Sequence, residues 1–152
     1  MSNKITPFLW FNNNLTEALE FYPTVFKDSK ILTSSKTPDG NFMTATFVLN
    51  GQEFLAMNAG PMFKFTEAIS FMIFCETQEE VDHYWNKLTS NGGEESRCGW
   101  LKDKFGLSWQ VTPTTLLRLM NDPDKVKAKR VMDAMMTMNK IVIADIEKAY
   151  KG

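Results

Sequence analysis

The stretch CGWLKDKFGLSWQVTP, residues 98–113, predicts two neighbouring β-strands joined by a tight turn. Apolar and aromatic residues flank the sequence KDKFG, and glycine is the residue that most easily adopts the backbone angles of such a turn. Since side chains along a strand alternate between two faces, Trp100 and Lys102 share one face, as do Ser108 and Gln110 on the following strand. The stretch therefore predicts a hairpin that carries an indole, an ammonium and an amide.

The residues before this hairpin predict a strand followed by a helix. The run AISFMIFCE, residues 68–76, is apolar enough for a buried strand, and Thr77 with Glu80 forms a capping box that starts a helix. Apolar residues then recur at helical spacing until the paired glycines Gly92 and Gly93, which end the helix. This half of the chain thus has the order strand, helix, strands.

The first half of the chain has the same order. ITPFLWF, residues 5–11, predicts the first strand, Asn14 is expected to cap the helix that follows, and Glu17 stands at the capping-box position. Three further strands are expected at residues 31–37, 42–50 and 52–58. Equivalent elements lie about 60 residues apart, so the chain contains an internal structural repeat.

The last part of the chain, residues 114–152, is predicted to be helical. Asp122 is expected as the N-cap of one helix, with Pro123 at its first position, and the apolar face of that helix needs a partner, either the sheet or a second subunit. We expect a single domain over residues 1–152. Its parts are module one at about 4–60, module two at about 68–113 and a helical C-terminal extension at 114–152.

The composition argues against nucleic acid and membrane surfaces as partners. The 152 residues include 17 Lys and Arg against 18 Asp and Glu, so no field of one sign attracts phosphates or anionic lipid. The first residues do not read as a signal peptide, and no apolar run has the length of a membrane span, which predicts a cytoplasmic protein. In a reducing compartment Cys75 and Cys98 are expected as free thiols.

Two βαβββ modules in a chain of this length resemble the vicinal oxygen chelate superfamily of glyoxalases, bleomycin-resistance proteins and extradiol dioxygenases. Within it, the stretches ITPFLWF, GPMFKFTEAISF and CGWLKDKFGLSWQVTP resemble the PhnB-like family labelled 3-demethylubiquinone 3-methyltransferase, and the likeness extends from about Lys4 to Tyr150. The resemblance implies an α+β fold whose two βαβββ modules form a cupped, mostly antiparallel sheet, with C-terminal helices. It also implies a homodimer.

The resemblance also indicates where a metal ion would be held. In metal-using members of the superfamily, His or Glu ligands come from the first and last strands of each module. The corresponding positions here are Pro7, then Leu55 or Met57, then Ser70 and Gln110. Because Zn, Ni and Fe require imidazole, thiolate or carboxylate donors, we expect no metal and no other cofactor.

Two other chemistries find little support in the residues. The glycine-rich loop that opens a helix in methyltransferases of the usual fold is missing, since Gly92 and Gly93 end a helix, so the family label is weak evidence about activity. A nucleophilic cysteine needs a neighbouring base, and Cys98 has Arg97 beside it but no histidine near it in the sequence. His83, the only histidine, is expected on the polar side of its helix.

A small-molecule site in the cup is the alternative that we favour. Ser70 and Gln110 would supply oriented polar contacts, Trp100 would stack on a ring and Lys102 would neutralise an anionic group, although each tryptophan could instead be a packing residue. The expected ligand-binding residues are Met57, Asn58, Phe63, Ser70, Met72, Cys98, Trp100, Lys102 and Gln110.

We therefore predict a metal-independent protein that binds a small molecule, with sequestration of the kind seen in antibiotic-resistance proteins as one form of this function and a homodimer as its assembly. One alternative is an enzyme that acts on a small aromatic or quinone-like compound, which Gln110, Lys102 or Cys98 would polarise. A second alternative is an interaction module with a filled cup.

Overall fold

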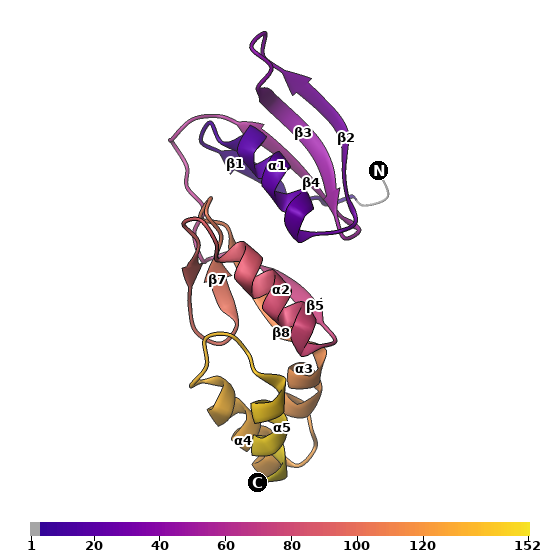
Figure 1. Ribbon diagram of the computed structural model, residues 1–152, viewed down its shortest axis with the longest axis vertical. Helices are drawn as coiled ribbons and strands as arrows, with labels where there is room; N and C mark the ends of the chain where they lie inside the picture. Colours follow the sequence, from indigo (N-terminus) through magenta and orange to yellow (C-terminus); the bar gives the residue numbers. More distant parts are fainter. Residues whose placement is uncertain (1–3) are drawn as a thin grey trace. The chain divides into compact units, whose positions relative to one another are not determined.

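The computed structural model describes residues 4–152, and the chain separates into two compact units with their boundary between Phe65 and Thr66. Each unit contains one four-stranded mixed sheet with the element order βαβββ, and the second unit continues into three more helices (Figure 1). The α+β class, the two modules and the C-terminal helices are thus confirmed. A single domain over residues 1–152 stays a prediction.

The first unit is a four-stranded sheet with one helix on it. Its elements are β1 (Phe8–Phe11), α1 (Leu15–Val25), β2 (Ser29–Lys36), β3 (Phe42–Leu49) and β4 (Gln52–Asn58). The strand order is β1-β4-β3-β2, in which β1 runs parallel to β4 and the other pairs are antiparallel. The turn Asn50-Gly51 joins β3 and β4 as the sequence predicts, with a positive φ at both residues.

The core of the first unit lies between α1 and one face of this sheet. Because strand residues alternate, every second side chain of β1, β3 and β4 is buried and the intervening ones are more exposed. The buried side chains of these strands are Leu9, Phe11, Ala45, Phe47, Leu49, Phe54 and Ala56. They meet the apolar stripe of α1, namely Leu15, Ala18, Leu19, Tyr22 and Val25. The opposite face of the sheet carries the less buried side chains.

The start of α1 is capped from a strand and not by Asn14. Asn14 occupies the N-cap position, but its side chain makes no capping hydrogen bond, and its buried Oδ1 has no partner within residues 4–152. Asn58, at the end of β4, accepts a hydrogen bond from the Leu15 amide at 3.0 Å and donates one to the Phe42 carbonyl at 2.9 Å. One amide therefore ties helix, β3 and β4 together, which corrects the expectation for Asn14.

The second unit repeats the arrangement and adds to it. Its elements are β5 (Phe71–Cys75), α2 (Gln78–Leu88), β6 (Glu94–Glu95), β7 (Trp100–Lys102), β8 (Ser108–Pro113), α3 (Thr114–Met120), α4 (Lys125–Met135) and α5 (Ile143–Lys151). The strand order is β5-β8-β7-β6, with β5 parallel to β8. The predicted capping residue of α2 is confirmed, because Thr77 Oγ1 accepts a hydrogen bond from the Glu80 amide at 3.2 Å.

The turn between β7 and β8 is organised by Asp103. This residue is 2% exposed, and its carboxylate accepts hydrogen bonds from the amides of Phe105 (2.9 Å) and Leu107 (3.0 Å) and from the indole of Trp109 (3.0 Å). The indole bond also explains why Trp109 is buried as a packing residue. Asp103 is therefore a structural carboxylate that holds the hairpin.

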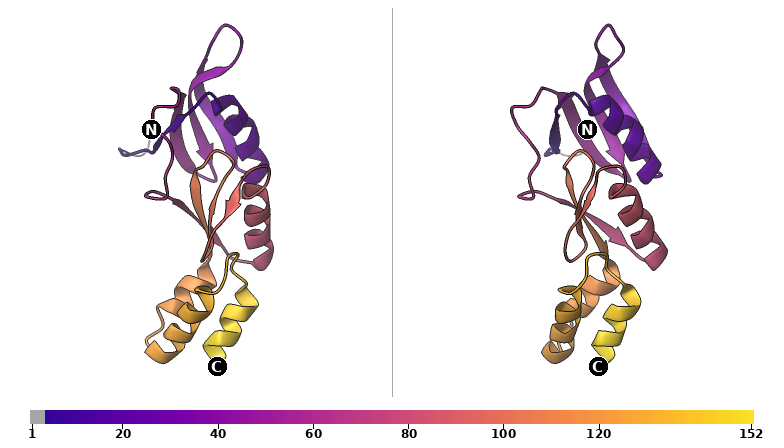
Figure 2. Two further views of the ribbon diagram at one scale, coloured as in Figure 1. Left: turned by 90° about the vertical axis from the view of Figure 1, so that its left-hand side faces the viewer. Right: turned by 60° about the vertical axis from the view of Figure 1, so that its left-hand side comes forward.

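The C-terminal helices α3, α4 and α5 pack on one another around an apolar cluster (Figure 2). The buried members are Leu116, Leu119, Val131, Ile141 and Ile146. None of the helices within residues 4–152 is long and apolar enough to cross a membrane.

The start of α4 differs from the sequence expectation. The helix begins at Lys125, and Asp124 is its N-cap, accepting hydrogen bonds from the amides of Val126 (3.1 Å) and Lys127 (3.2 Å). Asp122 instead accepts the Asp124 amide and the Tyr150 hydroxyl, both at 2.8 Å. The carboxylate of Asp122 thus joins α5 to the turn before α4, and Asp124 takes the N-cap position of α4 in its place.

Gln78, at the start of α2, fastens the extension to the second module. Its Nε2 donates to the Ile141 carbonyl at 3.1 Å, and its Oε1 accepts from the Ile143 amide at 2.8 Å. Lys140 and Asp82 form an ion pair next to this contact, with Nζ and Oδ1 2.9 Å apart. The segment that leads into α5 is therefore held by a side-chain amide that satisfies two backbone groups.

We predict that Asn58→Ala lowers the free energy of unfolding by about 1–3 kcal/mol, because it removes the cap of α1 and leaves the Phe42 carbonyl without its partner. Asn14→Ala is the matched control and should change stability by less than about 0.5 kcal/mol, since that side chain makes no capping bond. Urea denaturation followed by circular dichroism measures both. A larger loss for Asn14→Ala than for Asn58→Ala would contradict the assignment.

We predict that Gln78→Leu destabilises the second unit by about 1–3 kcal/mol, because the Ile141 carbonyl and the Ile143 amide lose their partner. The segment between α4 and α5 should also become more sensitive to limited proteolysis. Glu79→Gln, at the exposed neighbouring position, is the control for a changed α2 surface. Equal protease resistance of Gln78→Leu and Glu79→Gln would show that the amide does not hold the extension.

Candidate functional site

The open face of the second sheet brings together five of the nine predicted ligand-binding residues. Ile73, Cys75, Trp109 and Val111 are buried on the side of α2, so the alternate positions lie on the other face. On that face Met72 pairs with Gln110 across β5 and β8, and Gln110 pairs with Trp100 across β8 and β7. The five predicted residues on this face, which is called the open face below, are Ser70, Met72, Trp100, Lys102 and Gln110.

The amide of Gln110 is oriented by its neighbour on the open face. Its Nε2 donates a hydrogen bond to Ser70 Oγ at 2.9 Å, so one donor of the amide is satisfied. Met72, which stands beside it in the row, is 38% exposed, and Trp100 on the other side is half-buried. The centre of the open face is thus an oriented amide between an apolar thioether and an indole.

A hollow of about 240 Å³ opens at the β6–β7 end of this face. Its lining, called the acidic hollow below, consists of Glu67, Glu94, Glu95, Ser96, Trp100, Leu101, Lys102 and Ser108. The sheet register places three of these side chains in a second row, because Glu94 pairs with Lys102 and Lys102 pairs with Ser108. Trp100 and Lys102 therefore belong both to the open face and to the acidic hollow.

The only ammonium group of the acidic hollow is already paired. Lys102 Nζ lies 2.9 Å from Glu67 Oε1. The hydrogen bond from Lys102, together with its charge, lowers the pKa of Glu67, while the hydrogen bond to Glu67 and the charges of Glu67 and Glu94 raise the pKa of Lys102. The predicted anion-binding lysine is thus surrounded by carboxylates.

Ser108 is the polar group of the acidic hollow that lacks a partner. Its side chain is 1% exposed, and its Oγ has no hydrogen-bond partner within residues 4–152. A buried hydroxyl without a partner costs about 1–3 kcal/mol. A ligand or an ordered water that reached this hydroxyl would recover that cost.

The three predicted residues of the first unit have separate surroundings. Met57 pairs with Trp10 across β4 and β1, and the ring of Trp10 meets that of Phe63 edge-on with centroids 4.9 Å apart. Met57 and Phe63 thus border one aromatic patch around Trp10. Asn58 is used as the clamp of α1.

The ninth predicted residue, Cys98, lies in the loop before β7. Its amide donates to the Met138 carbonyl at 2.8 Å, and its Sγ is 3.9 Å from Met136 Sδ. The structure therefore brings Cys98 to the C-terminal segment. The other cysteine, Cys75, is fully buried, and burial followed by the charges of Glu80 and Glu76 raises its pKa to about 12, which makes it unreactive near neutral pH.

The positions that would hold a metal ion carry poor donors. Pro7 precedes β1 and its carbonyl accepts the Leu55 amide at 2.9 Å, so the side chains that share the face of Leu55 and Met57 are Phe8 and Trp10. The first-strand position expected at Pro7 therefore falls on Phe8 or Trp10 instead, and neither side chain is a metal ligand. Within residues 4–152 no three His, Cys, Asp or Glu side chains are grouped so that they could hold a metal ion.

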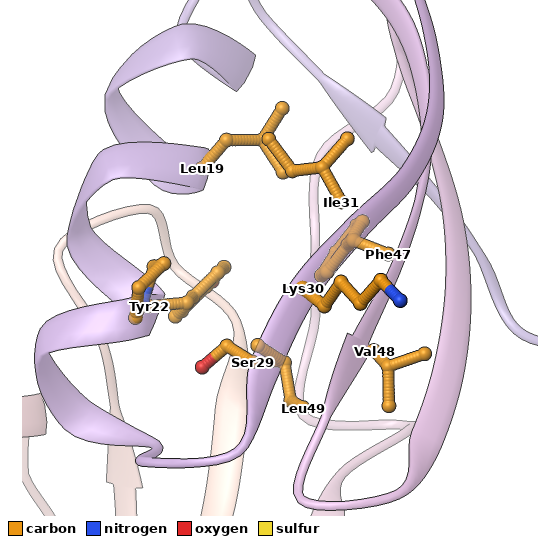
Figure 3. A pocket seen from close by; sticks show the side chains of 9 residues that line it. Leu19, Tyr22, Ser29, Lys30, Ile31, Phe47, Val48 and Leu49 are labelled. Carbon is orange, nitrogen blue, oxygen red and sulfur yellow. The ribbon is translucent and has the colours of Figure 1, made fainter.

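A second hollow, in the first unit, is smaller and more apolar. It measures about 90 Å³ and lies between α1 and the strands β2 and β3, where Leu19 and Ile31 point toward one another (Figure 3). Ligand pockets usually measure about 300–1,000 Å³, so this hollow suits a packing defect more than a site. The acidic hollow comes closer to that range.

The sequence reasoning missed the carboxylates of the acidic hollow. Glu94 and Glu95 form a strand of only two residues, and the four residues between β6 and β7 hide the pairing of Glu94 with Lys102. Ser108 carried a usable signal, since it shares the strand face of Gln110. Its missing partner could be seen only in the folded structure.

Comparisons with known proteins agree with this fold. Residues 3–112 match the family 3-demethylubiquinone-9 3-methyltransferase. A PhnB protein from Bacillus cereus, described as such a methyltransferase, is 37% identical, with 73% of this chain and 99% of that chain covered and a TM-score of 0.67. The protein PA1353 from Pseudomonas aeruginosa is 20% identical over 74% of this chain and 98% of its own, with a TM-score of 0.60.

A more distant structure is a mutant of the fosfomycin resistance protein FosX from Listeria monocytogenes, complexed with Mn(II) and 1S,2S-dihydroxypropylphosphonic acid. It is 18% identical, with 72% of this chain and 90% of that chain covered and a TM-score of 0.54, so the likeness concerns the fold. No curated protein matches the chain. By its family match and its Bacillus cereus relative, the chain belongs to the PhnB-like 3-demethylubiquinone-9 3-methyltransferase family, with the fold of the glyoxalase/bleomycin-resistance superfamily.

Proposed function

We propose that this protein is a metal-independent binder of a small molecule, which it holds on the open face of its second sheet and in the acidic hollow. The observation that carries the proposal is the buried Ser108 hydroxyl, which has no hydrogen-bond partner among the described residues and lies beside a hollow walled by Trp100 and Lys102. Binding sites combine apolar walls with a few oriented polar groups. Met72, Trp100 and the Ser70–Gln110 pair supply that combination here.

Metal independence is supported by the donor chemistry. The inward positions of both sheets carry aromatic, aliphatic, thioether, hydroxyl and amide groups, which are weak ligands for Zn, Ni, Fe and Mn. The carboxylates that line the acidic hollow are those of Glu94 and Glu95 on β6 and that of Glu67, and Glu67 is neutralised by Lys102. We therefore do not expect this chain to catalyse a metal-dependent reaction.

Binding without turnover is the form of the proposal that we favour over the enzyme alternative. An enzyme that acts on a quinone-like compound needs a base or a nucleophile near the substrate. His83 is exposed on α2, Cys75 is buried, and Cys98 contacts the C-terminal segment. The name of the Bacillus cereus relative suggests a methyltransferase, but none of the five side chains of the open face is an imidazole, a thiol or a carboxylate, and two of the three carboxylates of the acidic hollow are engaged by Lys102 and by the Trp85 indole.

We also propose that the protein is a cytoplasmic homodimer, as the family resemblance implies. Two free thiols suit a reducing compartment, and α4 with its C-cap residue exposes Val126, Met132 and Met136, which a second subunit could cover. Size-exclusion chromatography with light scattering measures the assembly. A monomer at high concentration would refute the dimer and leave the binding site unaffected.

The first test combines metal analysis with a ligand screen. Protein purified without chelator should contain no stoichiometric Zn, Ni, Fe or Mn, and a thermal-shift screen of metabolites and aromatic antibiotics should find a compound that stabilises it. A ligand at 100 times its Kd adds about 2.7 kcal/mol, which raises the Tm of a chain of this length by roughly 5–10 °C. Recovery of the compound unchanged distinguishes binding from catalysis.

Variants locate the site of any hit. Trp100→Leu should weaken binding at least tenfold, because the indole forms a wall of both the open face and the acidic hollow. Met132→Leu, at an exposed position of α4, should leave the affinity unchanged. A metal bound stoichiometrically, or a ligand insensitive to Trp100→Leu, would refute the proposal.

The Glu67–Lys102 pair gives a prediction about pH. Because the pKa of Glu67 is lowered, the ion pair is fully formed above the ordinary glutamate pKa and is lost as the pH falls through the lowered value. Because the pKa of Lys102 is raised, the pair is also lost at high pH, as the pH rises through the raised value. In Lys102→Met the pKa of Glu67 should rise toward its ordinary value. NMR titration of the carboxyl carbon measures this, and Lys104→Met is the control. An unchanged titration in Lys102→Met would show that the pair does not form.

A further inference from the structure

The acidic hollow carries a net negative charge. The carboxylates of Glu67, Glu94 and Glu95 line it together with the ammonium of Lys102. Glu95 pairs with Leu101, whose side chain is buried on the α2 side, so Glu94 is the carboxylate beside Lys102 that is left unmatched. Glu67 is satisfied by Lys102, and Glu95 accepts a hydrogen bond from the Trp85 indole at 2.6 Å. Glu94 faces Lys102 from the neighbouring strand and carries the remaining acceptor capacity.

We propose that the acidic hollow binds a small organic amine as its ammonium ion, with the cationic head near Glu94 and Ser108 and its apolar part against Trp100. This inference rests on the proposed small-molecule site and names the chemical class of its ligand. It reverses the expectation that Lys102 receives an anion. An anionic ligand would have to displace Glu67 from Lys102 and then lie beside the carboxylate of Glu94.

The polar atoms of the hollow favour an ammonium that carries N–H groups. Carboxylates accept hydrogen bonds and do not donate them, and a serine hydroxyl can accept as well as donate. Ser108 Oγ is 1% exposed and has no partner in the described chain, so it is the buried group whose hydrogen bonding a ligand would complete. A quaternary ammonium has no N–H to offer and would leave this hydroxyl without an N–H donor.

Trp100 supplies the second element of recognition. Its indole is half-buried, lines the acidic hollow, and stands in the row with Gln110 and Met72. An ammonium is attracted to the face of an indole, and an apolar substituent could extend over Met72. With a hollow of about 240 Å³, the fitting ligand is smaller than most drugs, such as an arylalkylamine.

The test compares four compounds of similar size: phenethylamine, its N,N,N-trimethyl analogue, phenethyl alcohol and phenylacetate. Titrations followed by tryptophan fluorescence and by isothermal calorimetry should give the lowest Kd for phenethylamine, with the alcohol and the carboxylate at least tenfold weaker. The trimethyl analogue should also bind more weakly. Equal binding of that analogue would overturn the role of Ser108 and Glu94 as hydrogen-bond acceptors.

Two variants and one control assign the effect to the hollow. Glu94→Gln removes one charge and keeps the shape, so the Kd of phenethylamine should rise at least tenfold, and Ser108→Ala should raise it with little change in Tm. Glu79→Gln removes an equivalent exposed carboxylate of α2 outside the hollow and should leave the Kd unchanged. Equal Kd values in Glu94→Gln and Glu79→Gln would overturn the proposal.

The outcomes separate this inference from the function on which it rests. If phenylacetate binds more tightly than phenethylamine, the ammonium ligand is refuted and the small-molecule site is kept. The same conclusion follows if a neutral or anionic hit binds more tightly than phenethylamine and loses affinity in Trp100→Leu. Failure of all four probes, together with a wide screen that gives no hit, would refute both. A hit that binds the first unit would refute the placement of the site.

Discussion

The carboxylate of Asp103 sets the register of the hairpin on which the candidate site depends. It is buried and accepts three hydrogen bonds, two from backbone amides of the turn and one from the Trp109 indole. With the turn closed in this way, Leu101 pairs with Trp109 and Lys102 with Ser108. A slip by one residue would exchange the two faces of β8, which would bury Gln110 against α2 and expose Trp109.

The start of β7 is held from the other side by the C-terminal extension. The amide of Gly99 donates to the Asn139 carbonyl at 2.8 Å, and a Cβ at this residue would lie 2.8 Å from the Val111 carbonyl oxygen and 3.2 Å from Ile141 Cγ1. With a φ of +83°, the position needs glycine both for its backbone angles and for space. The family match ends at residue 112, so the contacts that hold the backbone next to Trp100 come partly from a segment outside that match.

The sequence predicted the order of the elements well, because each signal was local. Strand alternation, the N-cap at Thr77 and the turn at Asn50-Gly51 act within a few residues, and the structure contains all three, although Glu80 accepts from the Glu76 amide and not from that of Thr77. Signals that depend on distant partners failed. Asn14 was preferred as the cap of α1 by its position, whereas Asn58 reaches the same amide from a strand 43 residues away. The loop between β6 and β7 likewise hid the place of Glu94.

The same distinction explains the change in how the site is understood. Strand parity correctly grouped Ser70, Met72, Trp100, Lys102 and Gln110, because it depends only on spacing within each strand. The charge around Lys102 depends instead on which segments fold beside it, and the structure places Glu67 and Glu94 there. Lysine in an apolar cup would attract an anion, whereas lysine already neutralised among several carboxylates leaves a negative field. The ligand chemistry of this sheet is therefore set by its edge strand and its preceding connector more than by the inward positions that define the superfamily's metal sites.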